Sequence, residues 1–124
     1  MKEVMAFIRA NKVNDTKRAL GEAGFPAFTC RRVLGRGKKM VDSTVLEIVM
    51  ESGELPVSTV GEAMTETKRL IPKRFFTLVV EDECVKNAVD TIIRVNQTGN
   101  PGDGKIFIFD IPETYKVRTG EMTL

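Results

Sequence analysis

Apolar residues gather in four short runs along this chain, and each run has the composition of a β-strand. The runs are rich in β-branched and aromatic residues, which favour the extended conformation because they pack well on a pleated surface. The predicted strands are residues 4–9, 28–34, 74–80 and 105–110. The run at 74–80 is the clearest of them, and the run at 28–34 is stopped by Gly35 and Gly37.

Two helices are predicted between these strands, because apolar residues recur there at intervals of three and four. The residues predicted to begin or end a helix are Asn14 or Asp15, Gly24 and Pro26 for the first helix, and Glu81, Asp82 and Gly99 for the second. The inward faces are predicted to hold Thr16, Ala19, Leu20 and Ala23 on the first helix, and Val85, Ala88, Val89, Ile92 and Ile93 on the second.

The order of these elements is β-α-β-β-α-β, which predicts a ferredoxin-like α+β fold with one four-stranded antiparallel sheet and two helices on one face. Two helices cannot cover both faces of the sheet. On the last strand, Phe107 and Phe109 share one face while Ile106 and Ile108 share the other. Since both faces are apolar, both are expected to be buried, and oligomerisation is the simplest way to cover the second one.

A long segment, about residues 36–71, separates the second and third predicted strands. Residues 45–50 form a strand-like apolar run, residues 52–56 break it, and Thr59 with Glu62 could form a capping box at the start of a short helix. Two interpretations stay open. The apolar residues could fold back on their own domain, or they could form a docking surface that becomes ordered on a partner.

Composition indicates one ordinary globular domain over residues 1–124, with 42% hydrophobic residues and a formal net charge of only +2. Such a charge gives no indication of nucleic-acid binding, and residues 73–77 lack the glycine of the RNA-binding K/R-G-F motif. Two distant cysteines, Cys30 and Cys84, occur in a chain without histidine, which argues against a zinc site and against imidazole catalysis. With no signal-peptide pattern and no apolar run of membrane-spanning length, we expect a cytoplasmic protein with free thiols and no stable membrane insertion.

A glycine-rich segment before the last strand carries a phosphate-binding pattern. Gly99, Gly104 and Lys105 match G-x-x-x-x-G-K, in which backbone N–H groups close around phosphate oxygens and the lysine supplies charge. Ile106 stands where a P-loop NTPase has the Ser or Thr that holds Mg²⁺, and the loop follows a helix instead of preceding one. These differences indicate a sensor that holds a nucleotide, not an enzyme, although slow ATP hydrolysis as a reset of the signal stays open.

Two parts of the sequence resemble a known protein family. Residues 91–110, followed by residues 117–121, resemble the C-terminal signature of PII nitrogen-signalling proteins. The N-terminal part agrees with that family in order and spacing at Arg9, Asp15, Lys17, Ala19, Leu20, Gly24, Thr29, Gly35 and Gly37. The resemblance covers nearly the whole chain except residues from about 40 to 70.

The resemblance implies a ring-shaped trimer whose sheets line the centre and which binds ATP or ADP in each cleft between neighbouring subunits. One subunit would contribute Gly35, Gly37, Lys38, Gly102, Asp103, Gly104 and Lys105. The adjacent subunit would contribute Thr29, Thr77, Val79, Lys116 and Arg118. Lys116 stands where the family usually has arginine, so it keeps the charge but loses a bidentate fork.

The second effector implied by the resemblance is 2-oxoglutarate, held by Mg²⁺, ATP and a lysine that corresponds to Lys73. The family usually places at position 39 a glutamine that ligates Mg²⁺, but this chain has Lys39, whose ammonium cannot coordinate a metal. Three explanations stay open. The metal is held differently, Lys39 reaches the phosphates or the keto acid directly, or this subunit senses poorly alone.

The long middle segment corresponds to the loop through which PII proteins contact their targets. Its contact residues are predicted to be Val45, Leu46, Ile48, Met50, Val60 and Met64. It is longer than usual and lacks the modifiable tyrosine, since the only tyrosine of the chain is Tyr115. This combination resembles the PII-like branch of methanogens and related anaerobes, in which two paralogues assemble, bind a nitrogenase component and inhibit it under nitrogen sufficiency until 2-oxoglutarate with ATP releases it. The alternative is a generic PII regulator of an ammonium transporter or a nitrogen-assimilation enzyme.

Overall fold

The computed structural model describes residues 1–37 and 70–124. The chain divides into two units, Met1–Val33 with Pro72–Leu124 and Leu34–Ile71, and each is considered by itself. The predictions made for Lys38, Lys39 and the loop residues Val45, Leu46, Ile48, Met50, Val60 and Met64 lie outside the described residues.

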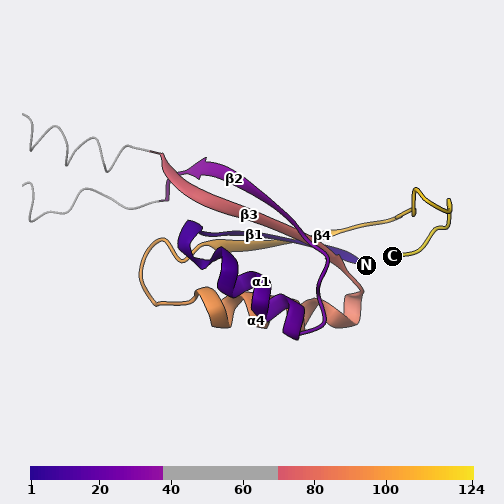
Figure 1. Ribbon diagram of the computed structural model, residues 1–124, viewed down its shortest axis with the longest axis horizontal. Helices are drawn as coiled ribbons and strands as arrows, with labels where there is room; N and C mark the ends of the chain where they lie inside the picture. Colours follow the sequence, from indigo (N-terminus) through magenta and orange to yellow (C-terminus); the bar gives the residue numbers. More distant parts are fainter. Residues whose placement is uncertain (38–69) are drawn as a thin grey trace, which may run out of the picture. The chain divides into compact units, whose positions relative to one another are not determined.

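All four predicted strands are present. They are β1 (Lys2–Arg9), β2 (Thr29–Gly35), β3 (Ile71–Val80) and β4 (Lys105–Asp110). The strand β1 pairs antiparallel with both β3 and β4, and the order across the sheet is β2-β3-β1-β4. This order places the two central strands, β1 and β3, side by side although about sixty residues of sequence separate them. The predicted ferredoxin-like α+β fold is therefore confirmed (Figure 1).

The two helices are α1 (Val13–Glu22) and α4 (Val85–Asn96), and each follows a short 3₁₀ turn, η1 (Ala10–Lys12) or η2 (Asp82–Cys84). The predicted side-chain caps at Asn14 or Asp15 and at Glu81 and Asp82 are wrong, because the chain enters each helix through this turn without a side-chain cap. The predicted end of α1 is confirmed. Gly24 has φ +92°, and the Phe25 N–H donates to the Leu20 carbonyl over 2.7 Å, which is the bond pattern of a Schellman motif.

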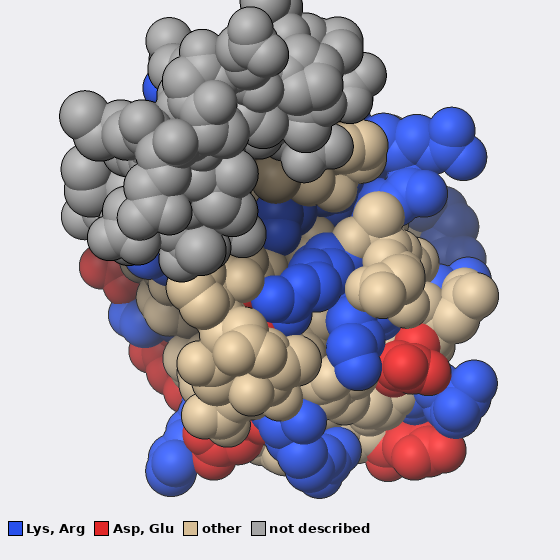
Figure 2. Space-filling view, turned by 90° about the vertical axis from the view of Figure 1, so that its left-hand side faces the viewer, with Lys and Arg blue, Asp and Glu red and all other residues tan. Residues whose placement is uncertain are grey.

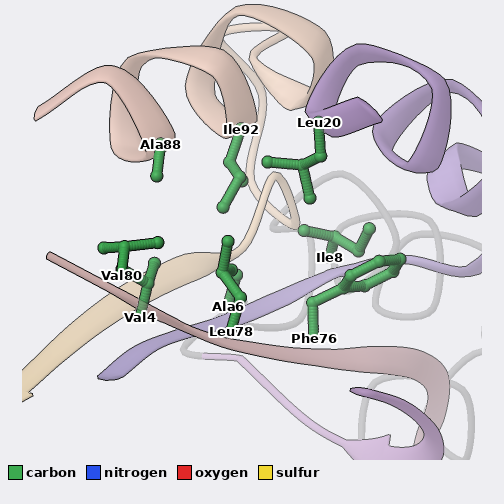
Figure 3. Close-up of a cluster of buried hydrophobic side chains, with 9 residues drawn as sticks. All are labelled: Val4, Ala6, Ile8, Leu20, Phe76, Leu78, Val80, Ala88 and Ile92. Carbon is green, nitrogen blue, oxygen red and sulfur yellow. The ribbon is translucent and has the colours of Figure 1, made fainter. Parts of the chain in front are cut away.

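The hydrophobic core lies between the helices and one face of the sheet (Figure 3). Buried apolar residues alternate along β1 and β3 and form the sheet side of the core, because every second residue of a strand points to the same face. The core residues are Val4, Ala6 and Ile8 of β1, Phe76, Leu78 and Val80 of β3, Leu20 of α1, and Ala88 and Ile92 of α4. The prediction that Ile93 faces inward is wrong, since its side chain is 42% exposed. Thr91 takes a buried position instead, where its hydroxyl donates to the Asn87 carbonyl over 2.7 Å.

Both α1 and α4 lie on one face of the sheet, and no helix of residues 1–37 and 70–124 lies on the second face (Figure 1). The register places Phe7 opposite Phe75, and their ring centroids lie 5.1 Å apart. Phe107, on the neighbouring strand, stands edge-on to Phe7 at 6.2 Å. Phe107 and Phe109 are 44% and 51% exposed, so the expected burial of both faces of β4 does not arise within one chain.

Candidate functional site

The glycine loop, residues 97–104, joins α4 to β4 at the end of the sheet where β1 ends. The register pairs Phe7 of β1 with Lys105, the first residue of β4, so the loop closes directly against the β1 backbone. Gly104 has φ +112°, and a Cβ on it would lie 1.8 Å from the Phe7 carbonyl oxygen. Only glycine fits this position, because any side chain would strain the backbone and collide with the neighbouring strand.

The carboxylate of Asp103 holds the loop together from inside. Its Oδ2 accepts the backbone N–H groups of Thr98 and Gly99 at 2.7 and 2.9 Å, and its Oδ1 accepts the Thr98 hydroxyl at 2.5 Å. Arg9, the last residue of β1, donates from Nη1 to the same Oδ1 at 2.5 Å. These hydrogen bonds, led by those from Thr98, hold the pKa of Asp103 far below its ordinary value.

Two basic side chains at the ends of β1 and β3 bind the loop from the sheet side. Arg9 also donates from Nη2 to the Pro101 carbonyl at 3.0 Å, and Lys73 donates to the Gly102 carbonyl at 2.8 Å. The register places Arg9 directly opposite Lys73. Burial, followed by repulsion from Arg9, lowers the pKa of Lys73, while Asp103 opposes that shift.

The result is an electropositive end of the sheet. Arg9, Lys73 and Lys105 contribute three positive charges near the loop, and Asp103 contributes one negative charge, which leaves an excess of two positive charges at this position. Figure 2 views this end of the molecule and shows Lys and Arg side chains gathered near its middle, with Asp and Glu toward the margins. Exposed glycine backbone at Gly102 and Gly104 beside such charges is suited to an anionic ligand.

The structure brings together only part of the predicted site. Gly102, Asp103, Gly104 and Lys105 are contiguous, and Lys73 contacts them through Gly102. Lys116 and Arg118 lie in a separate turn that follows β4, where the Lys116 N–H donates to the Glu121 carbonyl at 2.8 Å and both side chains are exposed. The two groups lie at opposite ends of β4, and the five steps from Lys105 to Asp110 span about 17 Å at ~3.3 Å per residue.

The other predicted positions lie along the sheet. Thr29 is the exposed first residue of β2. Thr77 and Val79 lie on the helix-free face of β3, opposite Met5 and Glu3, and the Thr77 hydroxyl donates to Glu3 at 2.8 Å. Gly35 ends β2, and Gly37 follows it in the unit Leu34–Ile71.

Sequence reasoning gave no role to Arg9 and Thr98, which make most of the contacts to Asp103. The spacing Thr98-x-x-x-x-Asp103 could have indicated a side chain that closes its own loop. For Arg9 no such signal exists, because its partners are about ninety residues away in sequence and meet it only through strand pairing.

Neither α1 nor α4, nor any other helix within residues 1–37 and 70–124, combines the length and apolar content that a membrane crossing needs. Over the same two ranges, no cluster of three or more His, Cys, Asp or Glu side chains is placed to hold a metal ion.

Comparison with known proteins agrees with this architecture. A model of the nitrogen regulatory protein P-II family matches residues 1–121. The chain is 40% identical over 121 residues to nitrogen fixation nifHD region GlnB-like protein 2 of Methanothermobacter marburgensis, covering 98% of this chain and 95% of that protein. It is 41% identical over 121 residues to nitrogen fixation nifHD1 region GlnB-like protein 2 of Methanosarcina barkeri, covering 98% and 94%. Nitrogen regulatory protein P-II 1 of Escherichia coli K12 is 36% identical over 121 residues, covering 98% and 95%.

These relatives agree with the resemblance seen in the sequence, including its nitrogen-fixation branch. The family model matches nearly the whole chain. The sequence identities of 36 to 41% extend over almost the full length of this chain and of each relative, and proteins that share only a fold need not be so similar. The chain therefore belongs to the nitrogen regulatory protein P-II family, whose members are signal-transduction regulators of nitrogen metabolism and not enzymes.

Proposed function

We propose that this chain senses nitrogen status by binding an adenine nucleotide and 2-oxoglutarate between subunits, and that it inhibits nitrogenase under nitrogen sufficiency. The observation that carries the nucleotide part is the separation of two cationic groups within one chain. The glycine loop with Lys105 lies at the start of β4, and Lys116 with Arg118 follows its far end, about 17 Å away along the strand. A polyphosphate can touch both groups only if a second copy supplies one of them.

The residues present fit an adenine nucleotide. The exposed backbone of Gly102 and Gly104 permits close approach of phosphate oxygens, and Lys105 adds a charge that no described acid neutralises within hydrogen-bond distance. In this proposal ATP or ADP acts as a ligand that carries the signal, and any hydrolysis is slow and resets it. Mg²⁺ would have to be held by the nucleotide itself, because the acceptors of Asp103 are taken by the loop and its Arg9 partner.

For 2-oxoglutarate the supporting observation is the state of Lys73. Its ammonium stands next to Arg9 and donates to a carbonyl, and burial, followed by repulsion from Arg9, lowers its pKa. A carboxylate would compensate the positive charge better than the neutral carbonyl of Gly102 does, since hydrogen bonds between two charged groups are the stronger kind. We propose that Lys73 exchanges the Gly102 carbonyl for a carboxylate of the keto acid, with Lys39 as a further candidate contact.

The uncovered face of the sheet supports self-association. Phe107 and Phe109 are exposed on it, and Phe7 lies on the same face with its ring against those of both Phe107 and Phe75. Glu3 lies between Phe109 and the exposed Val79, so the apolar part of this face is centred on the phenylalanines. A cluster of exposed aromatic side chains on one side of a sheet is typical of an interface. We propose that three copies, or copies of this chain and of a paralogue, meet through these faces in a ring, which also brings the two cationic groups of neighbouring chains together.

Target choice rests on the relatives. Several carry names that refer to the nitrogen fixation nifHD region, which supports a nitrogenase component as the target. A second candidate, a generic regulator of an ammonium transporter or a nitrogen-assimilation enzyme, is supported by the 36% identity to P-II 1 of Escherichia coli. Affinity capture from nitrogen-replete cells separates the two by the protein recovered, nitrogenase subunits in the first case and a transporter or a biosynthetic enzyme in the second.

The shared site is tested by mixing two inactive variants. Lys105→Glu damages the loop group and Lys116→Glu damages the terminal group, so each variant alone is expected to bind ATP roughly ten- to a hundredfold more weakly in calorimetry. Co-refolded mixtures should regain a fraction of full-affinity sites, because a loop from one variant can meet a terminal turn from the other. Lys86→Glu, which changes an exposed lysine paired with Asp90 on α4, is the control and should leave affinity unchanged. Mixtures that regain nothing would mean that each chain binds alone.

The effector step has its own measurement. Affinity of the purified assembly for the nitrogenase component is measured with ATP, with and without 2-oxoglutarate. The keto acid should weaken the complex in the parent protein and have little effect in Lys73→Met. An unchanged affinity in the parent protein on adding 2-oxoglutarate would end the proposal for that effector. Absence of ATP binding by the parent protein would end the nucleotide part as well.

A further inference from the structure

The carboxylate of Asp103 has its hydrogen-bonding capacity filled by its own chain. A carboxylate offers about four acceptor positions. In this structure Oδ1 accepts Arg9 Nη1 and the Thr98 hydroxyl, and Oδ2 accepts the N–H groups of Thr98 and Gly99. An anion so engaged is poorly placed to ligate a metal ion, and without a cationic partner it would repel a phosphate held by the same loop.

Arg9 supplies that cationic partner and fixes the loop at separate points. One guanidinium nitrogen binds Asp103 at 2.5 Å and lies 3.5 Å from the Thr98 hydroxyl, while the other binds the Pro101 carbonyl at 3.0 Å. A planar guanidinium can make these bonds at once, whereas an ammonium acts as a single point charge. The side chains of both Arg9 and Asp103 are about one-quarter exposed, so the pair is partly shielded from solvent.

The loop also packs closely on this pair. A Cβ added to Gly102 would come within 3.3 Å of Arg9 Nη2, and Lys73 binds the Gly102 carbonyl from the neighbouring strand. The guanidinium therefore fills the space beneath the turn formed by residues 101–103. Since β1 and β3 are the central strands of the sheet, the loop is attached to the most rigid part of the fold.

We infer that Arg9 and Asp103 form an internal clamp that sets the shape of the glycine loop before any ligand arrives, and that Asp103 is a positioning residue and not a ligand of phosphate or metal. The inference rests on the proposed function for its consequence, because a preformed loop binds a nucleotide without the cost of ordering. The clamp itself is a property of the free protein. It departs from the sequence-based prediction in which Asp103 contacts the phosphates directly.

The test combines hydrogen exchange with calorimetry on the full-length protein. Amide exchange of Thr98 and Gly99 is measured without ligand in Arg9→Met, Arg9→Lys, Asp103→Asn and the double variant Arg9→Met/Asp103→Asn. The exchange rates of both amides should rise in each variant. The rise should be smallest in Arg9→Lys, which keeps the positive charge but cannot make the two separate guanidinium hydrogen bonds. Controls that remove an exposed arginine and an exposed aspartate elsewhere, Arg18→Met and Asp90→Asn, should leave both amides unchanged.

Affinity is then measured for ADP without Mg²⁺ and for Mg²⁺·ATP. The clamp predicts that Arg9→Met and Asp103→Asn weaken both ligands by a similar factor, roughly tenfold or more, and that the double variant is no worse than either single one. Loss of Mg²⁺·ATP binding alone in Asp103→Asn would identify a metal ligand and overturn the inference. Additive losses in the double variant, or unchanged amide exchange in the single variants, would also overturn it.

The two proposals can fail separately. If the parent protein binds neither nucleotide, the proposed function falls, and the exchange measurements alone then decide whether the clamp exists. If the parent protein binds both ligands and the variants exchange and bind as the parent does, the clamp is refuted while the proposed function stands.

Discussion

Replacing Gly104 with alanine is the most direct test of how the glycine loop is built. The added Cβ would lie 1.8 Å from the Phe7 carbonyl oxygen and 2.9 Å from the Phe7 carbonyl carbon. Non-bonded heavy atoms have their optimal separation near ~3.5–4 Å, so the β1 and loop backbones would have to separate by more than about 1 Å. The movement would fall on the pairing of Phe7 with Lys105, at the end of the ladder that joins the edge strand β4 to β1.

Two costs add in this variant. A non-glycine residue in a sparsely populated backbone region costs on the order of 1–3 kcal/mol. Displacing a packed strand costs about as much again, in the range seen for over-packed interiors. We therefore expect Gly104→Ala to lower the free energy of unfolding by about 2–6 kcal/mol, a large part of the roughly 5–15 kcal/mol by which an ordinary domain is stable.

The assay is urea unfolding followed by far-UV circular dichroism, at one fixed protein concentration because self-association would shift the midpoint. Three glycines give matched controls. Gly102→Ala and Gly99→Ala, at φ +99° and +84°, should cost only the backbone strain, about 1–3 kcal/mol, because Gly102 faces the flexible end of Arg9 and Gly99 faces open space. Gly21→Ala, inside α1 with nothing within 4 Å, should stabilise the protein by about 0.5–1 kcal/mol.

The predicted order of stability is therefore Gly21→Ala, parent, Gly99→Ala, Gly102→Ala and Gly104→Ala. If Gly104→Ala loses no more stability than Gly99→Ala, the loop backbone at Gly104 is not packed against the Phe7 carbonyl of β1. If the order is unchanged but the slope of the free energy of unfolding against urea concentration differs between variants, the substitution has altered the unfolded state.

Three further predictions concern the core and the loop. Thr16→Val removes the buried oxygen that accepts Asn96 Nδ2 at 3.1 Å, so the free energy of unfolding should fall by about 1–3 kcal/mol in urea titration; no loss would mean that the pair is not buried as described. Phe76→Ala empties the centre of the core, where Phe76 is 0% exposed, and should cost about 3–5 kcal/mol by the same method; a loss below 1 kcal/mol would contradict the packing. The pKa of Asp103 is lowered in the folded state, so its stabilising contribution should be complete above the ordinary value of about 3.9 and be lost as the pH falls below it. The amide NMR shifts of Thr98 and Gly99 should therefore stay constant from about pH 8 to 5, and titration of either amide near neutrality would refute this reasoning.

Much of the fold could be predicted from local pattern. The strands could be predicted because they are rich in β-branched and aromatic residues, and because buried and less buried residues alternate along β1 and much of β3. The Schellman ending of α1 was found because Gly24 takes a backbone conformation that other residues avoid. Such features are decided within a few residues of the chain.

The wrong predictions, the helix caps and the inward position of Ile93, depend on how the chain packs beyond the neighbouring residues. Asn14 or Asp15, and Glu81 with Asp82, were predicted to cap the helices, but a 3₁₀ turn leads from the preceding strand into each helix and replaces the cap. Ile93 has the hydrophobicity of a core residue, yet the turn of α4 that faces the sheet presents Thr91 and Ile92 there. The orientation of a helix on its sheet is set by packing across the interface, which no single window of sequence records.

For the candidate site, the sequence by itself determined the glycine loop and its lysine, because these residues are adjacent in the chain, and it determined the family, because the characteristic residues recur in order and spacing. Only the tertiary structure decided that Arg9 holds Asp103 and that Lys73 holds Gly102, since strand pairing joins residues 94 and 29 positions apart. It likewise decided that Lys116 and Arg118 lie at the opposite end of β4 from the loop. The physical reason is that a sheet register fixes distances between strands, and those distances follow from the packing of the whole domain and not from any one segment.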